Sequence, residues 1–343
     1  MTLRSSLRAL ACIVAACGAT CAAQAAPSYH FVDLGADTGA YAINNHGAVA
    51  GNTGFTGGLT GIGAIWRDGA WQPNAQSEEF DDIDGQGERV GMLSTSDGRE
   101  HFAYWPHGGE PIEIVTPLGR GLTFTVAVAS GRAVGYGLGD DSAWHCFEWT
   151  PVGGYVDFGI GLGTGTCIAL DINDAGQATG DMTPVGGLHP QAFVWQDGAM
   201  NYLGTLPGGS TSSGAAINRK GHVAVNSDRS MPNGDVAQHA ALWNGRWLTD
   251  LGVLYPHGVS EARALNNHDD VVGSARDRRG IDHTLFLYTG GQMLDLLSLV
   301  VDKLDGWDLS AVSGIADDGT IIGTTMVGSV QHGYMLVPVT PLH

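Results

Sequence analysis

Positive charge is scarce in this chain. Its 343 residues include 16 Lys and Arg against 35 Asp and Glu, which gives a formal net charge of −19 at pH 7. An acidic surface repels phosphate backbones and anionic lipid headgroups, so we expect no nucleic acid partner. A net charge of this size also keeps an exported protein soluble, and that explanation accounts for the acidity without any ligand.

Long apolar runs and helical periodicity are missing as well. No run approaches the roughly 18 apolar residues of a transmembrane helix, and no segment keeps the spacing of an amphipathic helix. Residues 292–303 come nearest, and they are interpreted equally well as a strand and the start of a long loop. The 53 glycines and the low share of charged residues, 15%, favour short strands joined by tight turns. We therefore expect an all-β protein.

The common catalytic signatures are also absent. The sequence has no G-x-S-x-G elbow, no H-E-x-x-H pair, no phosphate-binding P-loop and no dinucleotide fingerprint. Nucleophilic catalysis therefore has no support in the sequence. We predict no catalytic residue, no bound cofactor and no metal site.

The N-terminus has the features of an export signal. Arg4 and Arg8 provide its positive start, residues 9–16 provide an apolar stretch, and residues 23–25 form an Ala-x-Ala cleavage site. We predict a signal peptide over residues 1–25 and a secreted or periplasmic bacterial protein.

Only two of the five cysteines remain after that cleavage, because Cys12, Cys17 and Cys21 lie in the signal. The segment before Cys17 loosely resembles a lipoprotein acylation site, so a lipid anchor at Cys17 is an alternative. The remaining pair, Cys146 and Cys167, can form a disulfide in an oxidising compartment. The sequence does not show whether the geometry permits that bond.

One phrase, Ala-Ile-Asn-x-x-Gly-x-Val-x-Gly, recurs seven times with variations. Asn or Asp at the turn entry can bond the backbone two residues on, and Gly three residues later supplies the positive φ that closes a hairpin. We interpret these Asn and Asp residues as turn formers rather than ion ligands. The second strand of each unit is predicted to end at Gly51, Gly91, Gly135, Gly180, Asn226, Gly273 and Gly323.

A large side chain ends the third strand of most units, and a polar turn and a fourth strand follow it. Four short strands in about 45 residues are typical of a propeller blade. The large side chains suit the packing between adjacent blades, so we interpret them as core and not as a cofactor site. They are Trp66, Trp105, Trp149, Trp195, Trp243, Tyr288 and, without an aromatic ring, Leu336.

The two ends of the predicted domain complement each other. The seventh unit stops after its third strand, at residues 332–337, whereas the exported chain opens with an isolated fourth strand at residues 29–35. Pairing of these strands would complete the last blade and remove its open edges. The sequence thus predicts one domain, residues 26–343, folded as a monomeric, closed, seven-bladed β-propeller with four antiparallel strands per blade.

Histidines and acids recur along the repeat. We expect the ring of each His to tie a loop to the backbone of a neighbouring blade, because third strands lie away from the axis and their side chains do not converge on a metal ion. Three acidic clusters, residues 78–82, 140–141 and 269–270, lack EF-hand spacing and are predicted to be solvated loop acids. The histidines before third strands are His101, His145, His239, His283 and His332.

We expect any function where the loops vary. In a propeller the links from second to third strand and from blade to blade share one face. One of these links carries the only basic cluster, Arg276, Arg278 and Arg279, which could bind a carboxylate through forked hydrogen bonds or merely balance nearby acids. His189 lies in an equivalent link. These four residues are the candidate ligand contacts.

Several phrases of the repeat resemble a known group. Residues 239–243 and 191–195 are similar to the H-A-F-[LV]-[WY] core of the HAF repeat family of bacterial secreted proteins. Residues 202–210 and 215–221 resemble its D-L-G-x-L-x-G-G-x-S and A-x-A-I-N-x-x-G segments. The resemblance covers nearly the whole predicted domain and is weakest in units three and seven. It implies export and a repeat fold, and it carries over no catalytic residue.

Three functions stay open. The leading hypothesis is a binding module that takes a glycan or a cell-surface protein on its loop-rich face. The alternatives are an extracellular polysaccharide hydrolase or lyase and a structural module of the envelope. An enzyme should gather several His, Asp or Arg side chains in one polar pocket at the axis mouth, whereas a binder should show a broad groove or an aromatic patch.

Overall fold

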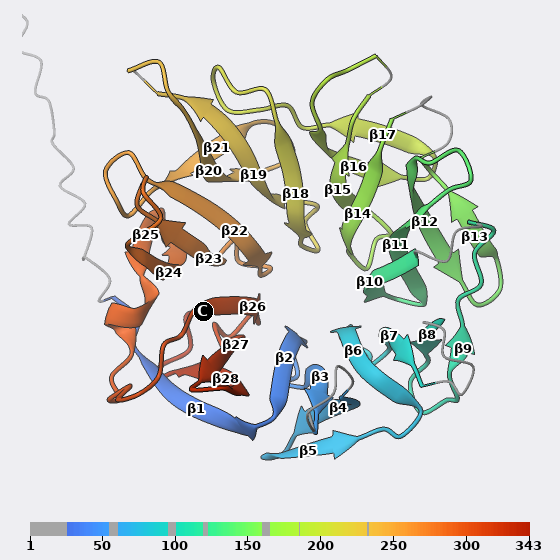
Figure 1. Cartoon of the computed structure of the whole chain (residues 1–343), viewed down its shortest axis with the longest axis horizontal. Coiled ribbons are helices and arrows are strands. Elements are labelled where there is room, and N and C mark those ends of the chain that lie inside the picture. Colours follow the sequence, from blue (N-terminus) through green and yellow to red (C-terminus); the bar gives the residue numbers. More distant parts are fainter. Residues whose placement is uncertain are drawn as a thin grey trace, which may run out of the picture.

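The computed structural model describes residues 26–54, 61–94, 101–118, 123–159, 165–184, 186–231 and 233–343. Seven antiparallel sheets of four strands stand around a common axis (Figure 1). This architecture confirms the predicted seven-bladed propeller. The predicted signal peptide, with Cys12, Cys17 and Cys21, lies outside the described residues.

In the first six blades the strands follow one another outward from the axis. Blades one to three comprise β2 (Thr38–Ile43), β3 (Val49–Thr53), β4 (Ile62–Arg67) and β5 (Ala70–Pro73); β6 (Ser77–Ile83), β7 (Arg89–Leu93), β8 (His101–Trp105) and β9 (Ile112–Glu113); and β10 (Thr123–Ala129), β11 (Arg132–Leu138), β12 (Trp144–Thr150) and β13 (Gly154–Asp157). Blades four to six comprise β14 (Cys167–Ile172), β15 (Ala178–Met182), β16 (Gln191–Gln196) and β17 (Ala199–Tyr202); β18 (Ser212–Ile217), β19 (Val223–Ser230), β20 (Val236–Trp243) and β21 (Leu248–Gly252); and β22 (Val259–Leu265), β23 (Val271–Arg276), β24 (His283–Thr289) and β25 (Gln292–Asp295). A short 3-10 helix, η2 (Leu296–Leu299), follows β25.

The seventh blade joins the two ends of the described chain. It contains β26 (Ala311–Ile315), β27 (Ile321–Val327), β28 (Val330–Pro338) and, as its outermost strand, β1 (Tyr29–Ala36). β1 pairs antiparallel with β28, so that Phe31 stands opposite Leu336. The predicted closure is therefore confirmed, and it removes the open edge that an unpaired β28 would present.

Apolar side chains fill the gaps between neighbouring blades. Phe147, Phe193 and Phe286 stand on third strands and are fully buried. The predicted tryptophan series contributes to the same clusters, with Trp105 1% and Trp149 5% exposed. Burying one large apolar side chain stabilises a fold by roughly 1.5–3 kcal/mol. These positions belong to the core, as predicted, although Trp66, Trp243 and Tyr288 are only partly buried and pack against its clusters.

Close approach of two strands explains the repeated glycine. A Cβ on Gly51 would lie 1.9 Å from the backbone oxygen of Gly39 on the first strand, so no side chain fits there. In blade five the glycine is on the first strand instead, where Gly214 stands opposite Val225. The close-approach position in this blade is thus Val225, one residue before Asn226. The predicted second-strand ends were too early, because β3 continues to Thr53 and β19 to Ser230.

Hydrogen bonds of a repeated Asn join the blades at the face of the first hairpins. The Oδ1 of Asn218 accepts the N–H groups of Lys220 (3.0 Å) and His222 (3.1 Å), and its Nδ2 donates to the carbonyl oxygen of Asn266 in the next blade (3.0 Å). The first two bonds confirm the predicted turn role, and the third adds a bond between blades. Together, the residues that make this set of bonds are called the amide latch: Asn44, Asn173, Asn218 and Asn266.

Other contacts join the blades that lack this Asn. A carboxylate oxygen of Asp84 accepts the N–H of Ser130 in blade three (3.0 Å), and the Ser130 hydroxyl donates to Asp174 in blade four (3.1 Å). Asn45 and Asp317 exchange two hydrogen bonds between blades one and seven. All seven neighbouring pairs of blades are therefore linked at the hairpin face.

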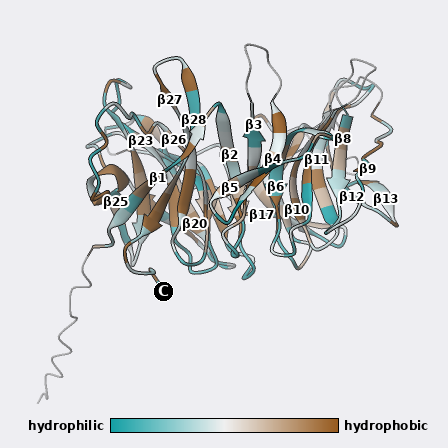
Figure 2. Cartoon of the chain, turned by 90° about the horizontal axis from the view of Figure 1, so that it is seen from below, coloured by the Kyte–Doolittle hydropathy of each residue, from teal (hydrophilic) through white to brown (hydrophobic). Residues whose placement is uncertain are grey.

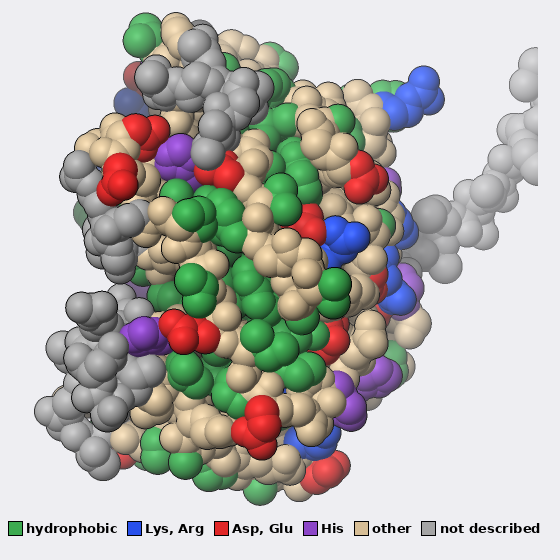
Figure 3. Space-filling model, turned by 90° about the vertical axis from the view of Figure 1, so that its right-hand side faces the viewer, with side chains coloured by type: hydrophobic (Ala, Val, Ile, Leu, Met, Phe, Trp, Pro, Cys, Tyr) green, Lys and Arg blue, Asp and Glu red, His purple; other side chains and the backbone are tan. Residues whose placement is uncertain are grey.

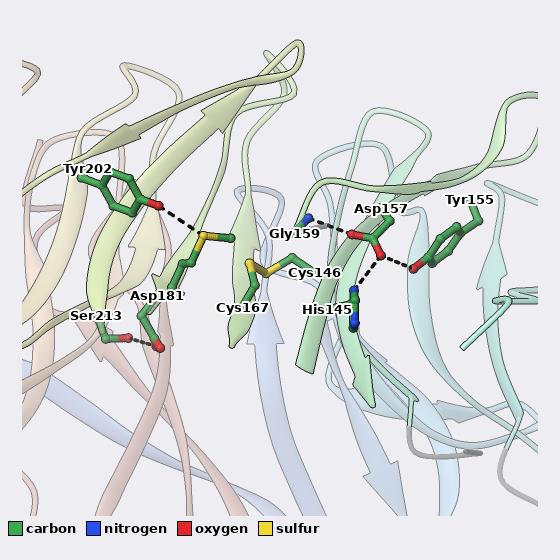
Figure 4. Close-up of a disulfide and its surroundings, with 10 residues drawn as sticks. His145, Cys146, Tyr155, Asp157, Gly159, Cys167, Asp181, Tyr202 and Ser213 are labelled. Atoms are coloured by element: carbon green, nitrogen blue, oxygen red, sulfur yellow. Dashed lines mark hydrogen bonds and ion pairs between the residues drawn. A yellow bond between two sulfur atoms is a disulfide. The ribbon is translucent and has the colours of Figure 1, made fainter. Parts of the chain in front are cut away.

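A disulfide adds a covalent link between blades three and four. Cys146 on β12 is bonded to Cys167 on β14, and both residues are buried (Figure 4). Blade three has Ala129 in the position of the latch Asn. The disulfide thus joins the same two blades between which the amide latch is interrupted, but nearer the loop-rich face.

The two faces of the ring differ in their connections. In the side view of Figure 2 the turn between β27 and β28 lies at the upper edge and the C-terminus at the lower edge. Antiparallel order places every link from second to third strand, and every link between blades, at the upper, loop-rich face. Among the described residues no helix has the length and hydropathy needed to cross a membrane.

The outer side of the ring is not uniformly polar. Figure 3 shows a band of hydrophobic side chains across the side that faces right in Figure 1, where β9, β13 and β17 lie. Val152, in the turn before β13, is 99% exposed, and Val115, after β9, is 68% exposed. No described segment of the chain covers these two side chains.

Candidate functional site in the central channel

A cavity of about 910 Å³ lies along the propeller axis. Residues of the first strand of every blade line its wall. Each first strand begins at the loop-rich face and runs toward the hairpin face. The cavity is also lined by Pro190, in the link between β15 and β16, and by Gln238, near the start of β20. Both lie toward the loop-rich face, which places the mouth of the cavity there.

Every first strand contains an extra residue relative to the second strand, and β6 has a second register shift between Ser77 and Glu79. The register between first and second strand shifts at the same place in all seven blades, which is the mark of a β-bulge. A bulge bends its strand and re-aims a side chain. The extra residue lies three positions before the latch position, and all seven line the channel. They form the bulge ring: Tyr41, Asp81, Val126, Leu170, Ala215, Arg263 and Ser313.

The bulge ring has no repeated chemistry. It contains one acid, Asp81, one cation, Arg263, one phenol, one hydroxyl and three apolar side chains. Side chains that recur in each blade maintain the fold of that blade. A position that varies while it faces a shared cavity is free to contact a ligand.

The channel wall is strongly acidic. Arg263 is the one Lys or Arg among the described residues that line it. For residues 78–82 the prediction of solvated loop acids was wrong, because this segment lies on β6, where Phe80 is buried in the core and its acidic neighbours line the channel. The carboxyl groups of the wall are Glu79, Asp81, Asp82, Asp171, Asp181, Asp228 and Glu261.

Two of these carboxylates hold neighbouring blades together. Asp82 accepts the N–H of Val128 in blade three (2.8 Å), and Asp171 accepts the N–H of Ile217 in blade five (2.7 Å). Burial raises the pKa of Asp82 to about 6. Burial and the negative charge of Asp82 raise the pKa of Asp171 to about 7. These two groups belong to the frame of the channel.

A third carboxylate lacks such support. The Oδ2 of Asp81 is buried and has no hydrogen-bond partner among the described residues. Burial, together with the charges of Glu79 and Asp82, raises the pKa of Asp81 well above its usual range. The hydroxyl of Thr125, which also lines the channel, is likewise buried and unpartnered, and the residue is 2% exposed. Two buried polar atoms in one cavity wall therefore lack a partner in the described chain.

An aromatic group borders the acids at the mouth. Phe124 and Tyr136 line the channel with ring centroids 5.3 Å apart, and Phe102 approaches Phe124 at 6.1 Å. Trp144 packs behind them, 5.6 Å from Tyr136. The rings face the channel from blades two and three. They provide an apolar surface next to charged groups.

Asp181 connects the aromatic group to the acids. Ser213 of blade five donates a hydrogen bond to the carboxylate of Asp181 (2.7 Å; Figure 4). Burial raises the pKa of Asp181, and this hydrogen bond partly offsets the effect. Burial and the charge of Asp181 together raise the pKa of Tyr136. The negative charge of Asp181 thus disfavours ionisation of the Tyr136 phenol at the channel mouth.

The other predicted acidic clusters lie away from the channel wall. Asp140 and Asp141 are exposed loop residues, as predicted. Asp270 contradicts the prediction, because it is 2% exposed and accepts hydrogen bonds from Asn266 (2.8 Å) and His343 (2.8 Å). Its neighbour Asp269 is bound by Lys220 and His222, so this cluster forms part of the hairpin face.

Four of the five recurring histidines approach a carboxylate of their own blade, whereas His283 is exposed at the start of β24. His239 on β20 approaches Asp250 on β21 at 3.0 Å, and His145 approaches Asp157 at 2.9 Å (Figure 4). The predicted bond to a neighbouring blade's backbone was wrong, because the fourth-strand acid lies directly beside the ring. His101 and His332 make the equivalent pairs with Glu113 and Asp33. Within the described ranges no group of three or more His, Cys, Asp or Glu is arranged to hold a metal ion.

The predicted arginine contacts lie at a separate place. Arg276, Arg278 and Arg279 line a pocket of about 370 Å³ between links of blades five and six. Arg278 forms an ion pair with Asp235, so this charge balances an acid. His189 is exposed in the blade-four link, beside the Pro190 that lines the channel. The four predicted contacts are therefore not gathered into one site.

Sequence reasoning missed the channel residues of blades four to six. Asp171, Asp181, Asp228 and Arg263 stand in strands that show no catalytic or binding motif. A position-by-position comparison of the seven repeats contained the missing signal. Three residues before the turn Asn, the side chain differs in chemistry from one repeat to the next.

The comparisons with known proteins identify the fold. No protein-family model matches the chain. No curated protein matches it. Its fold is similar to the β-propeller domain of the Trilobed protease from Pyrococcus furiosus, described as having an open velcro topology (TM-score 0.58, 8% identity, covering 91% of this chain and 98% of that one). It is also similar to Pyrococcus horikoshii acylaminoacyl peptidase (TM-score 0.50, 12% identity, covering 76% of this chain), of which it spans 45% of the length. At these identities the likeness shows a propeller fold and nothing finer.

Proposed function

We propose that this protein is an exported carbohydrate-binding propeller whose ligand enters the mouth of the central channel. The observation that carries the proposal is that Phe124 and Tyr136 line one cavity together with Asp81 and Thr125, each of which has a buried polar atom without a partner among the described residues. Ring faces stack on the apolar faces of sugars, and carboxylates accept hydrogen bonds from sugar hydroxyl groups. Ligand sites commonly combine an apolar wall with a few polar groups in this way.

The rest of the wall suits the same class of ligand. Thr211, Ser213 and Gln238 bring hydroxyl and amide groups to the mouth, whereas the amide of Asn226 is bonded to the backbone of Ala262. Such groups both donate and accept hydrogen bonds, as sugar hydroxyls do. A glycan is therefore preferred here to a protein partner, which would need a wide apolar surface on the loop-rich face.

Export is part of the proposal. The predicted signal peptide supports it, and so does the disulfide between Cys146 and Cys167, since disulfides persist in oxidising compartments. The repeat phrases resemble those of the HAF repeat family of bacterial secreted proteins. They therefore support both membership of that family and export. Sequencing of the N-terminus of the protein recovered from the producing cell tests export, and a mature chain starting near residue 26 is the expected result.

A glycan array probed with the purified protein tests the binding function. We expect a defined set of oligosaccharides to bind, and Tyr136→Ala to reduce their affinity about tenfold through loss of the stacking ring. Trp247→Ala is the matched control, because Trp247 is an aromatic residue 58% exposed on the outside of blade five. Absence of any bound glycan, or equal losses in the two variants, would contradict the proposal.

A polysaccharide hydrolase is the second candidate, and Asp81 favours it. A carboxyl with a pKa raised well above its usual range keeps its proton at higher pH and can serve as a general acid. The channel also gathers several acids and one arginine, as expected for an enzyme. Incubation of the protein with the glycans that bind, followed by product analysis, separates the candidates. Cleavage that disappears in Asp81→Asn would replace the binding-only function.

A further inference from the structure

We propose that the ligand of the channel mouth is an oligosaccharide of amino sugars whose amino groups are free and carry positive charge. This inference rests on the proposed glycan-binding function. It adds the chemical class of the ligand, which neither the fold nor the repeat phrases specify.

The balance of charge in the channel is the first argument. Among the described residues, seven carboxyl groups line the wall against one guanidinium, that of Arg263. Asp81, Asp82, Asp171 and Asp181 all have raised pKa values, chiefly because burial disfavours their charged forms. A cation placed among them offsets this cost, whereas a neutral sugar leaves it unchanged.

The unpartnered atoms give the second argument. Asp81 Oδ2 and Thr125 Oγ1 are both buried in the wall without a partner in the described chain, and the Asp81 carboxyl, once a nearby cation favours its ionised form, can only accept hydrogen bonds. A protonated amine carries three donors and no acceptor, so one such group can satisfy an acceptor that the chain leaves empty. A sugar hydroxyl offers a single donor and brings acceptors of its own into an acceptor-rich wall.

The aromatic group gives the third argument. Phe124 and Tyr136 present their rings beside Asp181, and the ring faces attract cations through their negative quadrupole. A ring and a carboxylate side by side favour an ammonium group over an acetylated amine, because the amide has no charge. The same rings remain available to stack on the sugar.

The distribution of the acids distinguishes this ligand from a metal ion. The seven carboxyl groups come from blades two, four, five and six, and in the described part of the chain no three of them converge as metal ligands do. Charges spread along a wall match an extended ligand with several positive groups. An oligomer of amino sugars has that form.

Calorimetric titration with two hexasaccharides tests the inference. The probes are the hexamer of glucosamine and its fully N-acetylated counterpart, compared at a pH at which the amines are protonated. We expect the free-amine hexamer to bind at least about tenfold more tightly, and added salt to weaken that binding. Asp81→Asn should reduce the affinity for the free-amine hexamer about tenfold.

Two further variants control for folding and for the sign of the charge. Asp305→Asn makes the same chemical change at an exposed loop residue outside the channel and should leave the affinity unchanged. Arg263→Ala removes the one cation of the wall and should strengthen binding, an effect that a damaged fold cannot produce. Thermal unfolding of each variant identifies those that have lost stability.

The possible results separate the inference from the function on which it rests. Equal affinity for the two hexamers, or weaker binding in Arg263→Ala, would overturn the amino-sugar class while glycan binding stands. Binding of other glycans but of neither hexamer would do the same. A tetralysine peptide that binds as tightly as the free-amine hexamer would overturn the sugar as the carrier of the charge. Absence of binding to any glycan would overturn the proposed function itself.

Discussion

The hairpin face and the channel mouth are built from the same seven first strands, yet they follow opposite rules. At the hairpin end the same amide recurs, and Asn44, Asn173, Asn218 and Asn266 make the same bonds. Three residues earlier, at the bulge ring, the side chains differ in chemistry from blade to blade, and the two charged ones, Asp81 and Arg263, have opposite signs. Repetition marks the part of the strand that holds the blades together. Variation at an equivalent position marks the part that is free to meet a ligand.

The gaps in the repeated part sharpen this difference. Where blade three has Ala129, the link to blade four passes to Ser130 and to the disulfide between Cys146 and Cys167. A lost latch is thus replaced by another contact at the same blade boundary.

The largest effect should come from the pH dependence of the channel acids. The pKa of Asp171 in the folded protein is about 7, above its value of about 3.9 in the unfolded chain. Its contribution to stability is therefore fully present below about pH 4 and is lost as the pH rises through about 7. We expect the free energy of unfolding to fall between pH 4 and pH 8 by roughly 2–4 kcal/mol, the lower figure allowing for water in the channel.

Urea unfolding at several pH values measures this effect, and Asp171→Asn should flatten the dependence. Asp305→Asn, which changes an exposed acid, is the control and should retain it. An identical pH profile in wild type and Asp171→Asn would show that burial of the Asp171 carboxyl does not cost stability at neutral pH. The channel and the hairpin face would then not differ in their electrostatic contribution to stability.

The next effect tests the covalent link at the interrupted latch. Reduction of the disulfide, whose cysteines are separated by 21 positions, should lower the free energy of unfolding by about 3 kcal/mol, because the unfolded chain gains freedom. Urea unfolding with and without reductant measures it. The double variant Cys146→Ala/Cys167→Ala should respond to neither condition. A wild-type protein equally stable in both would mean that Ser130 alone replaces the latch.

A smaller effect tests the amide latch itself. Asn218→Ala removes two bonds within the turn and one bond to the next blade, which should cost about 2 kcal/mol. Asn244→Ala is the matched control, because Asn244 accepts two N–H groups in its own turn and, among the described residues, makes no bond to another blade. It should cost about 0.5–1 kcal/mol. Equal costs, measured by thermal unfolding, would remove the contribution of the bond between blades.

The smallest effect is expected at the arginine pocket. Arg279→Ala should change the free energy of unfolding by less than about 0.5 kcal/mol, since the side chain is exposed. It should also leave glycan affinity unchanged, because its pocket of about 370 Å³ is separate from the channel. A loss of glycan binding in this variant, measured by calorimetry, would move the ligand site from the axis to the loops of blades five and six.

Much of the fold could be predicted because its determinants are local. The turn entry at Asn218 and the glycine at residue 221 specify a hairpin wherever they stand in the chain. The match of Phe31 with Leu336 could be predicted because both ends of the domain lack the strand that the other supplies. The disulfide partners were the two cysteines that lie outside the predicted signal peptide, although their geometry could not be derived from spacing.

The site was largely missed because its determinants are not local. Glu79 and Asp82 stand in a segment so rich in acids that a solvated loop was the natural interpretation, and only pairing with β7 places them at the axis. Asp171 has no charged neighbour in the sequence, and its raised pKa comes from burial and from Asp82 in another blade. The predicted arginines were the only basic cluster in an acidic sequence, but they lie in a pocket separate from the channel.

The amino-acid sequence by itself determined the hairpins, the number of blades and the strand that closes the ring, because each depends on short-range turn chemistry or on the count of strands. Only the tertiary structure decided which side chains face the axis. That choice depends on a bulge in each first strand and on the meeting of seven strands that are far apart in the chain. The chemistry of the channel is therefore a property of the closed ring and of no single repeat.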